Sequence, residues 1–285
     1  MSTRKAGDMA GDMAGDVTGD APGDAHGGAD GGVDVGELAA RLDAAAREVR
    51  AIPRLTDGLP PGTELGVDAA YRVQRAVIER RRARGERLAG VKMGFTSRAK
   101  MVQMGVDDVI WGLLTDTMLV ESSVDVSRLV HPRIEPEIAF LIGRPVRSAA
   151  DVDTAVAGVA VGFEVLDSRY RDFSFTLPDV IADNASAAGF GVGPWHAPER
   201  VADLTNVGLV MEIDGRVAQT GSSAAILGDP LRSLRAAARL AGQAGITLEP
   251  GWIVLAGAAT AAVPLPAGAH VRVTGAGLGR VEVTA

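Results

Sequence analysis

The chain has 285 residues, 47% of them hydrophobic, which is enough to form a sizeable core, and its formal net charge is −7. This acidic balance argues against nucleic acid or an anionic membrane surface as the main partner. No apolar run reaches the roughly 18 residues of a membrane span, and the first residues lack the apolar segment of a signal peptide. Zero cysteines exclude disulfides, thiolate metal sites and a cysteine nucleophile, and a cytoplasmic location is expected.

Residues 1–35 are predicted to form a disordered, acidic tail rich in Gly-Asp. A Gly-Asp pair recurs every four residues over 7–26 and runs into the glycine-rich stretch 27–32. So few apolar side chains cannot offset the entropy lost on ordering this segment. The run lacks the longer nonapeptide repeat of calcium-binding β-rolls, so a solvated tail is favoured over a calcium site.

Residues 36–88 are predicted to form a small helical N-terminal region. Apolar residues recur at helical spacing in 37–50, and a second amphipathic pattern covers 67–84. The second pattern ends in a run of arginines, which suits a helix C-terminus. A loop broken by Pro60, Pro61 and Gly62 separates the two helices.

Residues 89–285 are predicted to form a β-rich core that binds a metal. Short apolar runs split by glycine and proline predict strands at 89–95, 134–143, 156–166, 187–193, 207–213, 252–256, 270–274 and 280–284. A long helix is expected only over 231–244, with shorter ones near 97–104 and 151–157. Many strands with few interleaved helices indicate an α+β fold rather than a doubly wound sheet. No glycine-rich stretch has the strand–GxGxxG–helix context of a dinucleotide site.

Three glutamates in apolar, strand-like runs carry the strongest chemical signal. Glu135 and Glu137 lie in the run 134–142, and Glu164 lies near the end of the run 159–166. Alternate residues of a strand share a face, so Glu135 and Glu137 are expected side by side. Buried carboxylates repel each other unless protons or a cation compensate, and an all-oxygen set favours Mg²⁺ or Mn²⁺. The alternative is an edge strand, which Pro136 permits, with one or both of the pair in solvent.

Lys92 is an exception in a chain that uses arginine for its basic charge. Only Lys5, Lys92 and Lys100 are lysines among 29 basic residues. Lys92 lies inside an apolar, glycine-flanked run, where a compact ammonium fits a small buried site. The alternative is a lysine at a strand end whose ammonium reaches water.

Four motifs, in order, resemble the fumarylacetoacetate hydrolase superfamily, in its hydratase/decarboxylase branch from catechol meta-cleavage pathways. They are residues 92–106 (KMGFTSRAKMVQMGV), 131–140 (HPRIEPEIAF), 163–170 (FEVLDSRY) and 181–186 (IADNAS). The resemblance covers about residues 37–285, and the tail has no recognised counterpart.

The resemblance implies a mixed β-roll or sandwich core flanked by helices, in a protein that is usually oligomeric. It implies that the family's metal ligands fall on Glu135, Glu137 and Glu164. It also implies that the active-site lysine is Lys92 and that a serine contacting substrate is Ser186.

The reaction implied is the metal-dependent decarboxylation of 2-oxo-3-hexenedioate (4-oxalocrotonate), a small 2-oxo dicarboxylic acid, to 2-hydroxypenta-2,4-dienoate. A metal ion and Lys92 would stabilise the dienolate that forms. The sister hydratase of that dienoate is the alternative, and it needs groups that transfer protons. Related hydratases carry an aspartate where this chain has Ile110, although Asp107 or Asp108 are possible substitutes. Other 2-oxo-acid chemistry of the superfamily is a further alternative.

Several polar residues have two readings each. Thr260, Asp183 and Asp107 are expected substrate contacts, whereas a hydroxyl bonded to backbone or an Asp cap on a turn are equally simple roles. Arg133 and His131 are able to balance a distal carboxylate of the substrate, or they are surface residues flanking a strand. A homo-oligomer is expected, with association to a cognate hydratase as a further partner, and a non-catalytic subunit of such a complex is the alternative to an enzyme.

Overall fold

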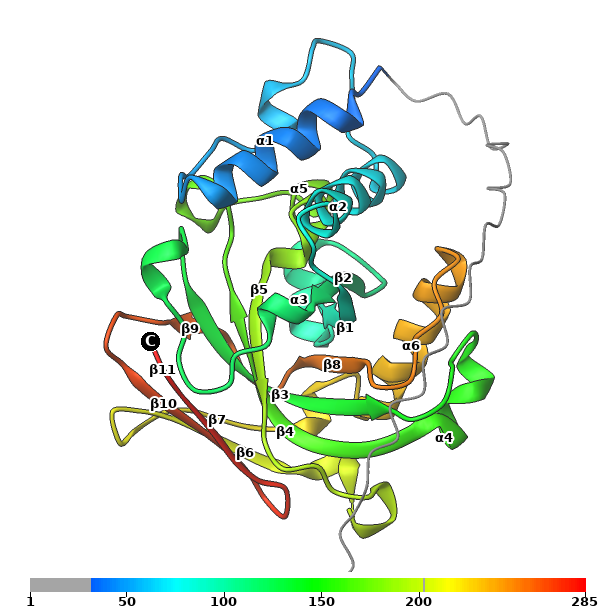
Figure 1. Ribbon diagram of the computed structural model, residues 1–285, viewed down its shortest axis with the longest axis vertical. Helices are drawn as coiled ribbons and strands as arrows, with labels where there is room; N and C mark the ends of the chain where they lie inside the picture. The colour runs from blue at the N-terminus through cyan, green and yellow to red at the C-terminus, as the bar shows by residue number, and fades with distance from the viewer. Residues whose placement is uncertain (1–31, 202) are drawn as a thin grey trace, which may run out of the picture. The chain divides into compact units, whose positions relative to one another are not determined.

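The computed structural model describes residues 32–201 and 203–285 (Figure 1). The predicted tail therefore lies outside the described residues, apart from 32–35. Of these, Val35 is already the first residue of helix α1 (Val35–Arg47), and Asp34 is its N-cap. The Asp34 carboxylate accepts a hydrogen bond from the backbone N–H of Glu37 at 2.9 Å, which satisfies one of the helix's open donors. No helix within the described ranges is long and apolar enough to cross a membrane.

Helices α1, α2 (Val67–Arg82) and α5 (Leu177–Ala182) gather at one end of the described chain (Figure 1). Their apolar faces form a core of their own, in which Leu38, Leu42 and Val73 are buried. Tyr170 is fully buried there and donates a hydrogen bond from its hydroxyl to the carbonyl of Asp179 at 2.9 Å. Helix α5 of this layer also packs on β2, the edge strand beside β1, which holds Lys92.

The larger sheet has seven strands, with the order β2-β1-β8-β3-β4-β5 and with β9 also pairing to β3. The strands are β1 (Leu88–Gly94), β2 (Ile110–Thr115), β3 (Arg133–Ile142), β4 (Val156–Leu166), β5 (Ala187–Val192), β8 (Ile253–Ala258) and β9 (Val263–Pro264). Only the β1–β8 pair is parallel among the named pairs of this sheet. The chain therefore crosses the sheet repeatedly and brings segments that are distant in sequence together at β3.

The smaller sheet has four antiparallel strands in the order β11-β10-β6-β7. They are β6 (Gly208–Ile213), β7 (Arg216–Ser222), β10 (His270–Gly275) and β11 (Gly279–Thr284). Strands β10 and β11 pack against β4 of the larger sheet, and the main apolar core lies between the two sheets. Helix α6 (Pro230–Gln243) packs on β8 and β1, while α3 (Arg98–Met104) and α4 (Val152–Ala155) are short.

The predicted α+β class with a mixed sandwich core flanked by helices is confirmed, and all eight predicted strands are present to within about two residues. Strands β2, β7 and β9 and helix α5 were not predicted. Strand β2 is buried along its whole length, so its residues show no alternation. Strand β7 is a largely exposed edge strand with few apolar residues, and α5 has only six residues.

Candidate active site

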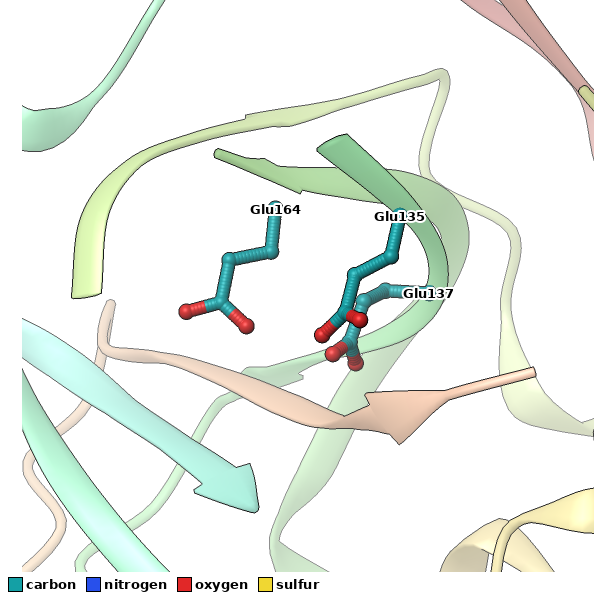
Figure 2. A group of neighbouring side chains, drawn as sticks. All are labelled: Glu135, Glu137 and Glu164. Carbon is teal, nitrogen blue, oxygen red and sulfur yellow. The ribbon is translucent and has the colours of Figure 1, made fainter. Parts of the chain in front are cut away.

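The three glutamates lie together on one face of two neighbouring strands. Glu135 on β3 pairs directly across the ladder with Glu164 on β4, and Glu137 follows two residues later on the same face. The carboxylate ligand atoms all lie within 4.8 Å of one another, and Figure 2 shows the three side chains pointing to the same side of the strands. Residues that the sequence separates are therefore combined by the β3–β4 register into one cluster.

The alternative of a solvent-facing edge strand is wrong. Strand β3 lies between β4 on one side and β8 with β9 on the other, and Glu137 and Glu164 are fully buried. Pro136 lies between the residues that pair with β9 and those that pair with β8, where a missing backbone N–H is tolerated. Its carbonyl accepts a hydrogen bond from the backbone N–H of Ala259 at 3.0 Å.

Without bound protons or a cation, the burial and mutual repulsion of the three carboxylates destabilise the folded protein. Burial raises the pKa of Glu164 to about 8; Lys92 acts against this shift and Glu135 adds to it. The pKa of Glu137 is raised well above its usual range, by burial first and then by the charges of Glu164 and Glu135. Among the described residues, no hydrogen-bond partner reaches Oε1 of Glu137 or Oε1 of Glu164. Converging carboxylate oxygens with open lone pairs fit a hard divalent cation.

Lys92 adds a buried positive charge to the cluster. Its side chain extends from β1, is only 3% exposed, and places Nζ 3.0 Å from Oε2 of Glu164. The ammonium also donates a hydrogen bond to the carbonyl of Ala185 at 3.0 Å. Burial lowers the pKa of Lys92, but the charges of the three glutamates outweigh it and the pKa is raised overall. The ammonium is therefore charged at neutral pH, and the structural alternative of a lysine reaching water does not hold.

Ser186 ends an unusual turn that faces Lys92. Asn184, Ala185 and Ser186 all have left-handed backbone angles, with φ of 52°, 51° and 60°. Such angles cost of order 1–3 kcal/mol for each residue and persist only where the surroundings impose them. Asn184 supplies the restraint, since its amide accepts from the N–H of Leu113 on β2 and donates to the carbonyl of Leu113, both at 2.8 Å. Within the described chain, the buried Oγ of Ser186 has no hydrogen-bond partner.

A cavity of about 830 Å³ opens beside this group. Lys92, Glu135 and Ser186 reach its lining, whereas Glu137 and Glu164 lie behind it. Ile110 lines it as well. Thr260 is also on the lining, and its hydroxyl donates to the carbonyl of Ala261 at 3.2 Å.

Two of the expected substrate contacts lie elsewhere. Asp183 is 1% exposed and is absent from the lining; its carboxylate forms an ion pair with Arg169 and accepts from the Arg169 backbone N–H at 3.0 Å. Asp107 is exposed and lies outside the lining. Asp183 thus has a structural role, as the partner of Arg169 rather than as the turn cap considered from the sequence, because burying a carboxylate requires a partner.

Two backbone groups of the site were not predicted from the sequence. The N–H of Gly257 donates to Oε2 of Glu137 at 2.5 Å, and Gly257 has a φ of +115°. A Cβ at this position would collide with the side chain of Thr96, so only glycine fits. The Ala185 carbonyl that holds Lys92 leaves no signal in a sequence, whereas a glycine near the end of strand β8 is a detectable hint.

Comparisons with known proteins agree with this geometry. Residues 90–285 match the family described as fumarylacetoacetate (FAA) hydrolase C-terminal. The chain is 53% identical over 240 residues to a 4-oxalocrotonate decarboxylase of a Pseudomonas species, covering 82% of this chain and 91% of that relative. It is 33% identical to a 2-hydroxyhexa-2,4-dienoate hydratase of Comamonas testosteroni, covering 85% of this chain and 94% of the hydratase.

A solved structure with the same fold is the 4-oxalocrotonate decarboxylase of Pseudomonas putida G7 in complex with magnesium and adipate. It aligns with a TM-score of 0.82 and 39% identity, over 88% of this chain and 96% of that one. The extent of the match leaves one conclusion: the chain belongs to the fumarylacetoacetate hydrolase family.

Proposed function

We propose that the chain is a carboxy-lyase that converts 2-oxo-3-hexenedioate to 2-hydroxypenta-2,4-dienoate with the help of a divalent metal ion. The observation that carries the proposal is a charged lysine and Glu135 on the wall of a cavity, with Glu137 and Glu164 converging on Glu135 and with the apolar Ile110 also on the lining. The similarity to 4-oxalocrotonate decarboxylases over most of the chain supports it.

Glu135, Glu137 and Glu164 would hold the ion, Mg²⁺ or Mn²⁺, through their convergent oxygens. A bound divalent ion supplies Lewis-acid polarisation of the 2-oxo oxygen and the neighbouring carboxylate oxygen of the substrate. Glu135 is the member of the cluster that borders the cavity, and the N–H of Gly257 fixes one oxygen of Glu137. The Glu137 carboxylate is therefore oriented before any ion binds, which lowers the reorganisation cost of binding.

The chemical step moves negative charge along the substrate. The C5–C6 bond breaks and CO₂ leaves; its electron pair forms the C4–C5 double bond, the C3–C4 double bond shifts to C2–C3, and the C2 oxygen becomes negative. A proton on that oxygen then completes the dienol, so no base is needed to break the carbon–carbon bond.

Lys92 is suited to stabilise the developing oxygen charge. An ammonium has three N–H donors; Lys92 donates one to the Ala185 carbonyl and forms an ion pair with Glu164. Lys92 lines the cavity, so its positive charge is available to a substrate oxygen there. The Ser186 hydroxyl, buried on the same lining, is a second donor for substrate oxygens.

The hydratase alternative requires groups that deliver protons to the carbon chain. Ile110 lies on the lining where related hydratases carry an aspartate, and it cannot exchange protons. Asp107 is exposed outside the lining, and Asp108 forms an ion pair with Arg239 at 2.8 Å. Neither proposed substitute reaches the cavity, so decarboxylation is favoured.

An ultraviolet assay with Mg²⁺ tests the proposal. Purified protein receives 2-oxo-3-hexenedioate in one sample and 2-hydroxypenta-2,4-dienoate in another, and CO₂ is measured alongside absorbance. We expect CO₂ from the first substrate and little loss of the second. Consumption of the dienoate alone would overturn the proposal in favour of a hydratase.

We also propose that the enzyme acts in the cytoplasm as a homo-oligomer and associates with a cognate hydratase that consumes its product. Because the dienol product is reactive, its direct transfer to the hydratase is a reason for the two enzymes to associate. Light scattering during size-exclusion chromatography tests the oligomer, and a single species at the monomer mass would contradict it. Co-elution with the hydratase tests the second part, and separate elution at micromolar concentrations would contradict that part.

A further inference from the structure

Arg133 lies on the same face of β3 as the glutamate cluster. Side chains two residues apart share a face, so Arg133, Glu135 and Glu137 form one row along the strand. Arg133 is half-buried and lines the cavity. Its guanidinium carbon lies 4.6 Å from the centre of the Phe173 ring, a cation–π contact that holds the group in one place.

The guanidinium has no carboxylate partner within ion-pair distance among the described residues. The other charged side chains on the lining are Lys92, Lys100, Glu135 and the exposed Asp172. Phe173 is placed beneath Arg133 by a turn in which Asp172 and Phe173 both have left-handed backbone angles, with φ of 58° and 56°. A positively charged group fixed on an aromatic ring at a cavity wall is arranged to receive an anion.

The spacing along the strand matches the length of a six-carbon diacid. Two residues of a strand span about 6.6 Å, which separates the Arg133 and Glu135 positions. The five bonds from C1 to C6 each advance an extended chain by roughly 1.2 Å, giving about 6 Å. A substrate whose 2-oxo end lies at the glutamate cluster and whose chain runs along β3 would place its far carboxylate on the Arg133 side of the cavity.

We propose that Arg133 binds the distal carboxylate and makes the site selective for dicarboxylic over monocarboxylic 2-oxo acids. This inference rests on the proposed function, since it assigns the far end of the same substrate. Arg133 contributes to substrate binding rather than to the rate of the chemical step. Negative charge leaves the distal carboxylate during decarboxylation, so Arg133 stabilises bound substrate at least as well as the transition state. Replacing it is expected to raise KM about ten- to a hundredfold without lowering kcat.

The test compares two unreactive ligands that differ only at the distal end. 2-Oxoadipate and 2-oxohexanoate have the same length, and neither has the double bond that decarboxylation needs. Calorimetry on the Mg²⁺-loaded protein should show that wild type prefers 2-oxoadipate by about ten- to a hundredfold. Arg133→Gln should remove this preference by weakening 2-oxoadipate alone.

Two further variants keep the result interpretable. Arg128→Gln changes an exposed arginine outside the cavity and should leave both affinities unchanged. Arg133→Lys keeps the positive charge without the planar guanidinium and should retain part of the preference for 2-oxoadipate. It takes the place of Arg133→Gln in the comparison if that variant does not fold.

The inference is overturned if wild type binds the two ligands equally or binds neither. It is also overturned if Arg133→Gln weakens both to the same extent, or if Lys100→Met removes the preference while Arg133→Gln keeps it. A failure of the decarboxylase proposal has a different signature, namely no CO₂ from 2-oxo-3-hexenedioate while the binding preference persists.

Discussion

Replacing Glu137 with glutamine should have opposite effects on the metal-free and metal-loaded protein. Glutamine keeps the shape of the side chain and an oxygen that accepts the hydrogen bond from the N–H of Gly257. It removes one of three negative charges from a cluster whose oxygens lie within 4.8 Å of one another. The metal-free protein should become more stable, and the protein should lose its divalent ion.

The magnitude follows from the spacing. Two carboxylate charges no more than 4.8 Å apart repel by roughly 3 kcal/mol or more at an effective dielectric constant near 20. The charge of Lys92 and retained protons offset part of this repulsion. We therefore expect the free energy of unfolding of the metal-free variant to exceed that of wild type by about 1–3 kcal/mol. Magnesium at a hundred times its dissociation constant should stabilise wild type by about 2.7 kcal/mol and the variant by almost nothing.

Urea unfolding at pH 7.5, once with a chelator and once with Mg²⁺, measures both effects, and Mn²⁺ calorimetry measures affinity directly. Glu249→Gln is the matched control because Glu249 is exposed and outside the cluster. Glu137→Gln protein that binds Mn²⁺ within a few-fold of wild type would refute the ligand assignment. A less stable metal-free variant would refute the account of repulsion.

Three further predictions concern the same site and the start of the chain. Lys92→Met should lower kcat by about a hundredfold or more while Mn²⁺ affinity changes by less than about tenfold, as steady-state kinetics and calorimetry can show; near-normal turnover would return Lys92 to a structural role. Metal affinity should fall by about tenfold or more for each pH unit below 8, because protonated Glu164, with its pKa raised to about 8, must release a proton on binding, and the raised pKa of Glu137 adds to the effect. Calorimetric affinity that is constant between pH 6 and 8 would contradict this. A chain beginning at Gly36 should be less stable by about 1 kcal/mol than one beginning at Gly32, because it lacks the Asp34 cap of α1; equal thermal unfolding of the two would refute the role of the cap.

Short apolar runs split by glycine and proline were sufficient to predict most strands, and the two-residue period of a strand was sufficient to predict that Glu135 and Glu137 share one face. This worked because side-chain direction along a strand is a local property of the backbone. Apolar runs around charged residues also indicated that the glutamates and Lys92 were buried. The missed strands show the limit, since β7 is largely exposed and has no apolar run, and β9 has only two residues.

The sequence by itself determined which residue types the site contains: three carboxylates, one lysine and one serine in apolar surroundings. Only the tertiary structure decided how they meet. The β3–β4 register sets Glu164 opposite Glu135, and β1 delivers Lys92 to within 3.0 Å of Glu164. The same packing pairs Asp183 with Arg169 instead of a substrate. These contacts join segments far apart in the chain, so they depend on how the sheet is assembled and leave no local pattern to read.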